Sequence, residues 1–172
     1  VRSTEAMSGL FKIDKEEAAD LLVNAPGTLL PPEAVVPILK SMGDGEWLCL
    51  YLSGIFRQDP ERASQYHNLL VQLLVDYGRP GALYAFLKTS THFSLDAALT
   101  LMGGRTGTNE GLFGRERVHV LATMGDLNAA MDILLKELQD VHGAIDFASE
   151  HEDVALWDRL IEHARGHAAT LA

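Results

Sequence analysis

Two histidines near the end of the sequence have the spacing of a metal site. His163 and His167 lie four residues apart, so a helix would place both imidazoles on one face, with the Glu162 carboxylate nearby. Gly166 weakens a helix at this point, and the pattern fixes no third ligand beside the pair. We therefore interpret the segment as a frayed polar terminus. A small helical metal-dependent enzyme that uses these residues is the rival hypothesis.

Other combinations of histidine and carboxylate are interpreted as chance neighbours. His151-Glu152 begins like a zinc-protease motif, but Ala155 occupies the position of the second histidine. Such neighbours are common in a chain with 7 histidines and 24 acidic residues. Two further pairs have the composition of a catalytic pair and are interpreted as solvated helix faces: His142 with Asp146, and His67 with Asp59.

The sequence presents no activated nucleophile. Ser53-Gly54 lies in an amphipathic segment rather than on the sharp turn that a hydrolase serine requires. Cys49 is the single cysteine and lies in the apolar run from Trp47 to Leu52, which predicts a buried, inert thiol. Because it has no second cysteine to pair with, the sequence fits a reducing cytosol.

The segment from Met102 to Gly114 is dense in glycine and lacks helical spacing. Loop amides can cradle phosphate, but Gly104 to Thr108 has no Gly-Lys-Ser/Thr ending and no preceding strand, and Glu110 would repel an anion. We expect a flexible loop near residues 103–114 with little packing. The sequence therefore predicts no catalytic, cofactor-binding or metal-ligating residue, and no cofactor.

Length, composition and charge exclude several classes of function. The chain has 172 residues, of which 47% are hydrophobic, enough for one domain or one block of a repeat array. A formal net charge of −10 without any local Lys/Arg cluster argues against nucleic acid and against direct binding to anionic lipid. The longest apolar runs fall short of the roughly 20 residues that span a bilayer. The chain begins at Val1 without the apolar core of a signal peptide, so we interpret it as a piece of a longer protein.

Helical periodicity recurs along the chain, and we find no convincing strand. The clearest helix has Asp59 as N-cap, Pro60 at the first helical position and Gly78 as left-handed C-cap. Its apolar stripe follows the i, i+3, i+4, i+7 spacing through Tyr66, Leu69, Leu70, Leu73, Leu74 and Tyr77. We therefore predict a helix over about residues 60–77.

The other predicted helices start at a capping side chain or a proline. Met-Gly-Asp occurs at residues 42–44 and again at 124–126, where glycine ends one helix and aspartate caps the next, which predicts tight αα-hairpins. Pro37 is expected to shorten or bend its helix. The expected starts are Asp14, Pro31-Pro32, Asp44, about Gly81, Ser94, Asp126, Asp140 and Asp153.

These elements predict an all-α protein, an elongated α-solenoid of about ten short antiparallel helices that forms a single segment over residues 1–172. An irregular helical bundle stays open, because no strict sequence period is visible. Trp47 and Trp157 continue apolar stripes and are expected to anchor the core. A set of acidic residues is interpreted as a solvated face, with a docking patch for a basic partner as the alternative: Glu137, Asp140, Glu150, Glu152 and Asp153.

A run of residues in the last third of the chain has the pattern of a known family. It consists of Glu137 to Val141, Ala144 to Ala148, Glu150, Asp153, Leu156-Trp157 and Leu160-Ile161. Earlier matches are Asp14 to Glu16, Arg79-Pro80, Phe86-Leu87, Leu121, Met124-Gly125 and Ala130. On these residues, nearly the whole chain resembles the clathrin heavy-chain repeat region of the vacuolar protein sorting-associated protein 41 family, a HOPS tethering subunit. The glycine-rich insertion from Gly103 to Gly114 departs from the family pattern.

The resemblance implies a non-enzymatic stalk segment in vesicle transport to the late endosome and the vacuole or lysosome. The family is cytosolic, held peripherally on those membranes, and takes part in tethering and in the adaptor-complex-three route. The expected partners are other HOPS subunits, with self-association and an adaptor-complex-three contact as further possibilities. Every matched residue is a core position, a cap or a turn, so no site residue carries over. A related coat or tethering subunit is the alternative.

Overall fold

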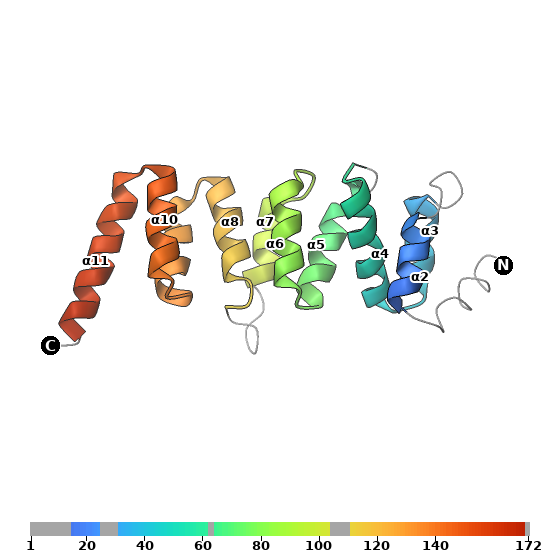
Figure 1. The fold of residues 1–172 in the computed structure, drawn as a ribbon, viewed down its shortest axis with the longest axis horizontal. Coiled ribbons are helices and arrows are strands. Elements are labelled where there is room, and N and C mark those ends of the chain that lie inside the picture. Colours follow the sequence, from blue (N-terminus) through green and yellow to red (C-terminus); the bar gives the residue numbers. More distant parts are fainter. Residues whose placement is uncertain (1–14, 25–30, 62–63, 104–110, 171–172) are drawn as a thin grey trace. The chain divides into compact units, whose positions relative to one another are not determined.

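The computed structural model describes residues 15–24, 31–61, 64–103 and 111–170 (Figure 1). Over these residues the chain contains α-helices and no strand, which confirms the all-α prediction. Two short elements of other helical type also occur, the 3₁₀ turn η1 (Ser64–Tyr66) and the π-helical turn η2 (Ile133–Glu137). The α-helices are α2 (Lys15–Asn24), α3 (Pro32–Ser41), α4 (Gly45–Gln58), α5 (His67–Asp76), α6 (Pro80–Thr89), α7 (Leu95–Gly103), α8 (Gly114–Met124), α9 (Leu127–Asp132), α10 (Val141–His151) and α11 (Val154–Thr170).

The helices form two compact units. Unit 1 takes the described residues up to Arg79 and the short segment Ser90–Phe93, and unit 2 takes Pro80–Thr89 and the described residues from Ser94 onward. In unit 1, α4 packs against α2, α3 and α5. In unit 2, α8 packs against α6, α7 and α9, and α10 packs against η2 and α11. Packing between sequence neighbours is typical of a helical-repeat solenoid, and the predicted fold class is confirmed.

The predicted aspartate caps are present at the starts of four helices. Asp44 accepts from the Glu46 amide at 3.2 Å, and Asp126 accepts from the Ala129 amide at 3.0 Å. Asp140 accepts from the Gly143 amide at 2.8 Å, and Asp153 accepts from the Ala155 amide at 2.9 Å. Each carboxylate satisfies an amide that the first helical turn leaves without a partner, which fixes where the helix begins.

In both predicted αα-hairpins, the residue before the cap has a left-handed backbone conformation. Gly43 has φ of +74° and Gly125 has φ of +85°, a region that glycine enters without a Cβ penalty. After Gly125, the Asp126 amide donates to the Leu121 carbonyl at 2.9 Å and closes the end of α8. The predicted hairpins at residues 42–44 and 124–126 are therefore confirmed.

Two further turns use the same left-handed conformation without glycine. Gln139 has φ of +52° and precedes the cap Asp140, while Glu152 has φ of +50° and precedes the cap Asp153. Both residues therefore keep a Cβ in a conformation that L-residues rarely adopt. These turns follow the pattern of the Met-Gly-Asp hairpins, but glycine no longer marks them in the sequence.

The helix that begins as α9 widens at its end into η2. There the Leu138 amide donates to the carbonyl of Ile133, five residues back, at 2.9 Å. Because each residue of a wider turn rotates the chain through a smaller angle, three successive side chains point in more similar directions. Ile133, Leu134 and Leu135 are all buried in the core of unit 2.

Two details of the predicted helices are wrong. The helix predicted over 60–77 begins at His67, because Asp59 belongs to the end of α4, where its amide donates to the Ile55 carbonyl at 2.9 Å. Tyr77 is 42% exposed, so it lies outside the buried stripe. Pro37, which the sequence predicts to shorten or bend its helix, lies inside α3, and the helix continues past it to Ser41.

Small residues bring the helices of unit 2 close together. Ala130, Ala144 and Ala148 are fully buried in its core cluster, where a larger side chain would hold the helices apart. Trp47 is buried in unit 1, as predicted. Trp157 is only partly buried and packs against the core cluster of unit 2.

In the part of the chain that the structure describes, none of the helices combines the length and the apolar content that crossing a bilayer requires.

Candidate functional site

The histidine pair near the end of the chain lies on α11. This helix continues through Gly166 to Thr170, so the prediction of a frayed terminus is wrong for its backbone. Glu162 is exposed and His163 is partly buried, while the side chain of His167 lies outside the described residues. Within the described residues, no group of three or more His, Cys, Asp or Glu side chains could hold a metal ion.

The other candidate chemical groups lie on an exposed helix face, pack against an aromatic ring or are buried. His142 and Asp146 are both exposed on α10, where they border an open groove. The His151 ring packs against Phe147, with 4.4 Å between ring centroids. Cys49 is buried, and this burial raises the pKa of its thiol, so the predicted inert thiol is confirmed.

His67 is part of a buried hydrogen-bond cluster in unit 1, so its interpretation as a solvated residue paired with Asp59 is wrong. Its side chain is 1% exposed. Its Nε2 lies 3.0 Å from the Pro60 carbonyl, which can only accept, so Nε2 carries the proton. Nδ1 is then the acceptor for the Ser90 hydroxyl at 2.7 Å.

This cluster joins the chain before α5 to the chain after α6. Phe56 packs edge-on to the His67 ring at 5.5 Å between centroids, and the burial lowers the pKa of His67. A neutral imidazole with both nitrogens hydrogen-bonded stabilises the fold. A signal for this was present, because His67 lies three and seven residues before the buried Leu70 and Leu74.

The glycine-rich segment packs more tightly at its end than predicted. Residues 104–110 lie outside the described residues, so the expected flexible loop is described only at its two ends. Phe113 is 2% exposed and lies in the core. A Cβ on Gly114 would lie 2.5 Å from Leu138 Cδ2, so a larger residue at the start of α8 would force the Leu138 side chain to move. The prediction of little packing is wrong for this end.

Glu116 is a buried carboxylate that sequence reasoning missed. It lies in the first turn of α8 and is 4% exposed, although Arg115 and Arg117 flank it in the sequence. Arg117 is paired elsewhere, with Glu137 at 2.6 Å. The Glu116 carboxylate accepts from its own backbone amide and lies in the field of Arg115, but it forms no ion pair with any described residue. Burial accordingly raises the pKa of its carboxyl.

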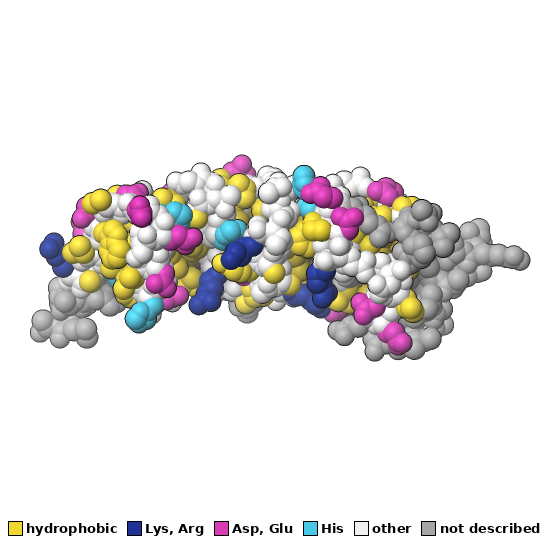
Figure 2. Space-filling model, turned by 45° about the horizontal axis from the view of Figure 1, so that its top comes forward, with side chains coloured by type: hydrophobic (Ala, Val, Ile, Leu, Met, Phe, Trp, Pro, Cys, Tyr) yellow, Lys and Arg dark blue, Asp and Glu magenta, His cyan; other side chains and the backbone are white. Residues whose placement is uncertain are grey.

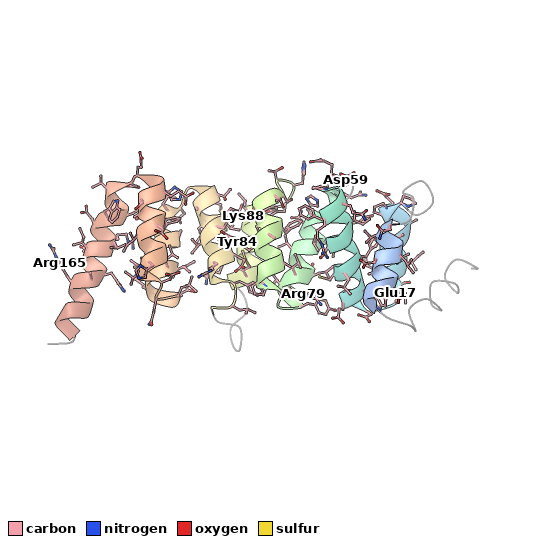
Figure 3. All side chains as sticks on the ribbon, viewed as in Figure 1. Glu17, Asp59, Arg79, Tyr84, Lys88 and Arg165 are labelled. Atoms are coloured by element: carbon pink, nitrogen blue, oxygen red, sulfur yellow. The ribbon has the colours of Figure 1, made fainter. Side chains whose placement is uncertain are left out.

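Glu116 faces a hollow of about 450 Å³ in unit 2, which we call the Glu116 hollow. Tyr84 on α6 lines one side, and Leu112 and Leu138 supply apolar walls. Lys88 lies one turn after Tyr84 (Figure 3), with its ammonium 5.4 Å from the ring centroid. A buried carboxylate that forms no ion pair with a described residue, in a largely apolar hollow, is suited to a cation.

A second depression of about 450 Å³, which we call the α10 groove, adjoins the first. Tyr84 and Arg115 line both. Its apolar lining includes Val118, Leu134 and Phe147, and its acidic lining comprises Asp140, Asp146 and Glu150. At the end of the chain that holds α10 and α11, acidic side chains border hydrophobic ones on the surface (Figure 2).

These two depressions offer no arrangement for covalent chemistry. Neither is lined by a serine or a cysteine. Their carboxylates and apolar side chains can bind a cationic, partly apolar ligand, which is the chemistry of a docking surface.

Comparisons with known proteins agree on one family. The sequence profile of the Vps41 TPR-like region matches residues 3–170. The chain is 32% identical over 153 residues to the human vacuolar protein sorting-associated protein 41 homolog, covering 88% of this chain and 17% of that protein. The zebrafish homolog is 33% identical over 155 residues, covering 90% of this chain and 17% of that protein.

The similarity extends to a yeast protein. Vacuolar protein sorting-associated protein 41 of Saccharomyces cerevisiae is 23% identical over 116 residues, covering 67% of this chain and 11% of that protein. The chain thus spans less than a fifth of the length of these relatives. No solved structure matches it.

Proposed function

Because the chain belongs to the Vps41 family, we propose that it is a non-enzymatic scaffold segment of a membrane-tethering subunit in transport to the late endosome and the vacuole or lysosome. The names of these relatives describe vacuolar protein sorting. Residues 1–172 act in this proposal as one solenoid segment. Its work is to hold other parts of a long subunit apart and to offer helix faces to partner proteins.

The observation that carries the proposal is the profile match over residues 3–170, nearly the full chain. The structure supports the proposal because the apolar side chains pack helix against helix. Leu83 on α6 and Val120 on α8, for example, are both fully buried. The surface left over carries charged helix faces, depressions and exposed apolar side chains such as Val154, which suit protein assembly.

The proposed partners are other HOPS subunits, with self-association and an adaptor-complex-three contact as further contacts. In this proposal the protein lies in the cytoplasm and is held peripherally on late endosomal and vacuolar or lysosomal membranes. The acidic surface would be repelled by anionic lipid, so the proposal assigns membrane attachment to partner proteins or to other parts of the subunit.

Crosslinking of the intact tethering complex tests the proposal. A lysine-reactive crosslinker would report contacts of Lys40 in unit 1 and of Lys88 and Lys136 in unit 2. We expect crosslinks from at least one of these lysines to another subunit of the complex. If all three crosslink only within the chain while lysines elsewhere in the subunit crosslink to partners, the segment is not an assembly surface.

Two other functions have less support. A related coat or tethering subunit is disfavoured because the relatives named above are all vacuolar protein sorting-associated protein 41. A metalloenzyme is tested by elemental analysis of the purified chain. Stoichiometric zinc or iron that is lost in a His163→Ala variant would overturn the scaffold proposal.

A further inference from the structure

The Glu116 hollow and the α10 groove act as adjoining parts of one surface in unit 2. Tyr84 and Arg115 line both, so the side chains between them belong to the two depressions together. Each has a volume of about 450 Å³, which is enough for several side chains of a bound peptide. The apolar positions Val118 and Phe147 provide contact area between the charged groups.

Two carboxylates of the α10 groove, those of Asp146 and Glu150, have no cationic partner among the described residues, unlike carboxylates nearby. Arg159 binds Asp132 at 2.7 Å, and Lys136 binds the same carboxylate at 3.2 Å. In contrast, neither Asp146 nor Glu150 forms an ion pair with any described residue. The sequence from residue 137 to 158 holds seven acidic residues and no Lys or Arg.

The buried carboxylate of Glu116 is the second, independent observation. A carboxylate that is 4% exposed, that accepts from its own backbone amide and that forms no ion pair with a described residue costs free energy in the unbound chain. A lysine ammonium or an arginine guanidinium entering the hollow would offset that cost, and the pairing would be strengthened because the hollow is partly shielded from water.

Arg115 is the single cationic side chain among the residues that line the two depressions. It is 78% exposed, and its guanidinium lies 3.7 Å from the Asp140 carboxylate, too far for a hydrogen bond. Asp140 is already engaged by the amide of Gly143. Arg115 is therefore held weakly and can turn away from the surface when another cation arrives.

We propose that the α10 groove and the Glu116 hollow together dock a basic, partly apolar segment of a partner protein. A lysine or arginine of that segment enters the hollow to pair with Glu116, further basic side chains pair with Asp146 and Glu150, and apolar ones cover Val118 and Phe147. This inference rests on the proposed function, because it supplies the chemistry of one partner of the scaffold. Nucleic acid and anionic lipid do not fit, since both would be repelled by the carboxylates.

A synthetic peptide tests the proposal directly. The probe is a fluorescein-labelled peptide of 14 residues with leucine and phenylalanine on one helical face and lysine on the other, and the control peptide has glutamate in place of every lysine. Fluorescence anisotropy is recorded with the purified chain at low salt and at about 0.2 M salt. We expect the lysine peptide to bind with an affinity that falls at higher salt, and the glutamate peptide not to bind.

Matched charge reversals locate the binding surface. Asp146→Lys with Glu150→Lys changes two exposed acids four residues apart on α10, and Asp158→Lys with Glu162→Lys makes the same change on α11. The net charge of the chain is identical in both variants. We expect the α10 variant to bind the lysine peptide at least tenfold more weakly, and the α11 variant to stay within about twofold to threefold of the original chain.

Glu116→Gln separates binding from folding. The substitution keeps the shape of the side chain and removes a buried charge. It is therefore expected to stabilise the chain while weakening the binding of the lysine peptide about tenfold. A folding defect cannot produce both results. Unchanged binding in this variant, or equal losses in the α10 and α11 variants, would overturn the docking proposal. Crosslinks from unit 1 to another subunit would in that case still support the scaffold function, so the two proposals fail separately.

Discussion

Replacing Ser90 with alanine is expected to destabilise unit 1 by about 2 kcal/mol. The Ser90 hydroxyl donates to Nδ1 of His67 at 2.7 Å, and both side chains are buried. Nε2 of the same ring is committed to the Pro60 carbonyl at 3.0 Å, so the tautomer cannot change without losing that bond. Alanine would therefore leave Nδ1 as a buried acceptor without a partner, at a cost of roughly 1–3 kcal/mol.

Fluorescence of Trp47 provides an assay for unit 1. The chain has two tryptophans, Trp47 in unit 1 and Trp157 in unit 2, so a Trp157→Phe background leaves one reporter. Urea unfolding at pH 8 would be followed with and without Ser90→Ala. Ser149→Ala is the matched control, because its hydroxyl bonds the Ile145 carbonyl on an exposed helix face, and we expect it to change stability by less than about 0.5 kcal/mol.

The result that would refute this reasoning is a Ser90→Ala variant as stable as the Ser149→Ala control. A double-mutant cycle adds a second criterion. In a His67→Leu background the acceptor is absent, so Ser90→Ala should then cost much less than it does in the original chain. Equal costs in both backgrounds would show that the hydrogen bond is not the source of the effect.

Three further predictions concern titration and turns. Burial lowers the pKa of His67, so the unfolded chain binds a proton at a higher pH than the folded chain does. The stability of unit 1 should therefore be complete above pH 6.5 and fall as the pH drops below 6.5, which Trp47 fluorescence would measure. Burial raises the pKa of Glu116. Glu116→Gln should therefore leave the melting temperature unchanged below pH 4.5, where the carboxyl is protonated in both states, and raise it relative to the original chain as the pH rises through the folded-state pKa of Glu116. Circular dichroism would measure the melting temperature. Gly125→Ala should cost about 1 kcal/mol because its φ is +85°, whereas Gln139→Gly should stabilise by about 0.5 kcal/mol at φ of +52°, both measured by urea unfolding.

The helix starts could be predicted because their determinants are local in the sequence. An aspartate caps the amides two or three residues ahead, so Asp44, Asp126 and Asp140 could be placed without knowledge of the fold. The start of α5 could not, because Asp59 and Pro60 have the local pattern of a helix start, yet the amide of Asp59 closes α4 instead. The Asp59 carboxylate still accepts from the Glu61 amide at 3.1 Å, so the local capping bond forms although α5 begins only at His67.

The burial of Glu116 could not be predicted for a related reason. Glutamate is a surface residue type, and its burial depends on helices brought over it from elsewhere in the chain, whereas the spacing of His67 to Leu70 and Leu74 offered a signal for the burial of His67. The acidic run from residue 137 to 158 is visible in the sequence, but the groove beside it is not, since Tyr84 and Val118 come from other helices. Charge is therefore readable from one segment alone, whereas a depression requires several.

The π-helical turn accommodates one extra residue between α9 and α10. The amide of Asp140 closes its turn onto the Leu134 carbonyl, six residues back, whereas Asp126 closes onto Leu121, five back. Removing the exposed Lys136 would return this helix end to the ordinary spacing, with the cap at Asp140 retained. A chain of stacked hairpins can thus gain or lose a residue inside a helix while the turns between its helices keep their geometry.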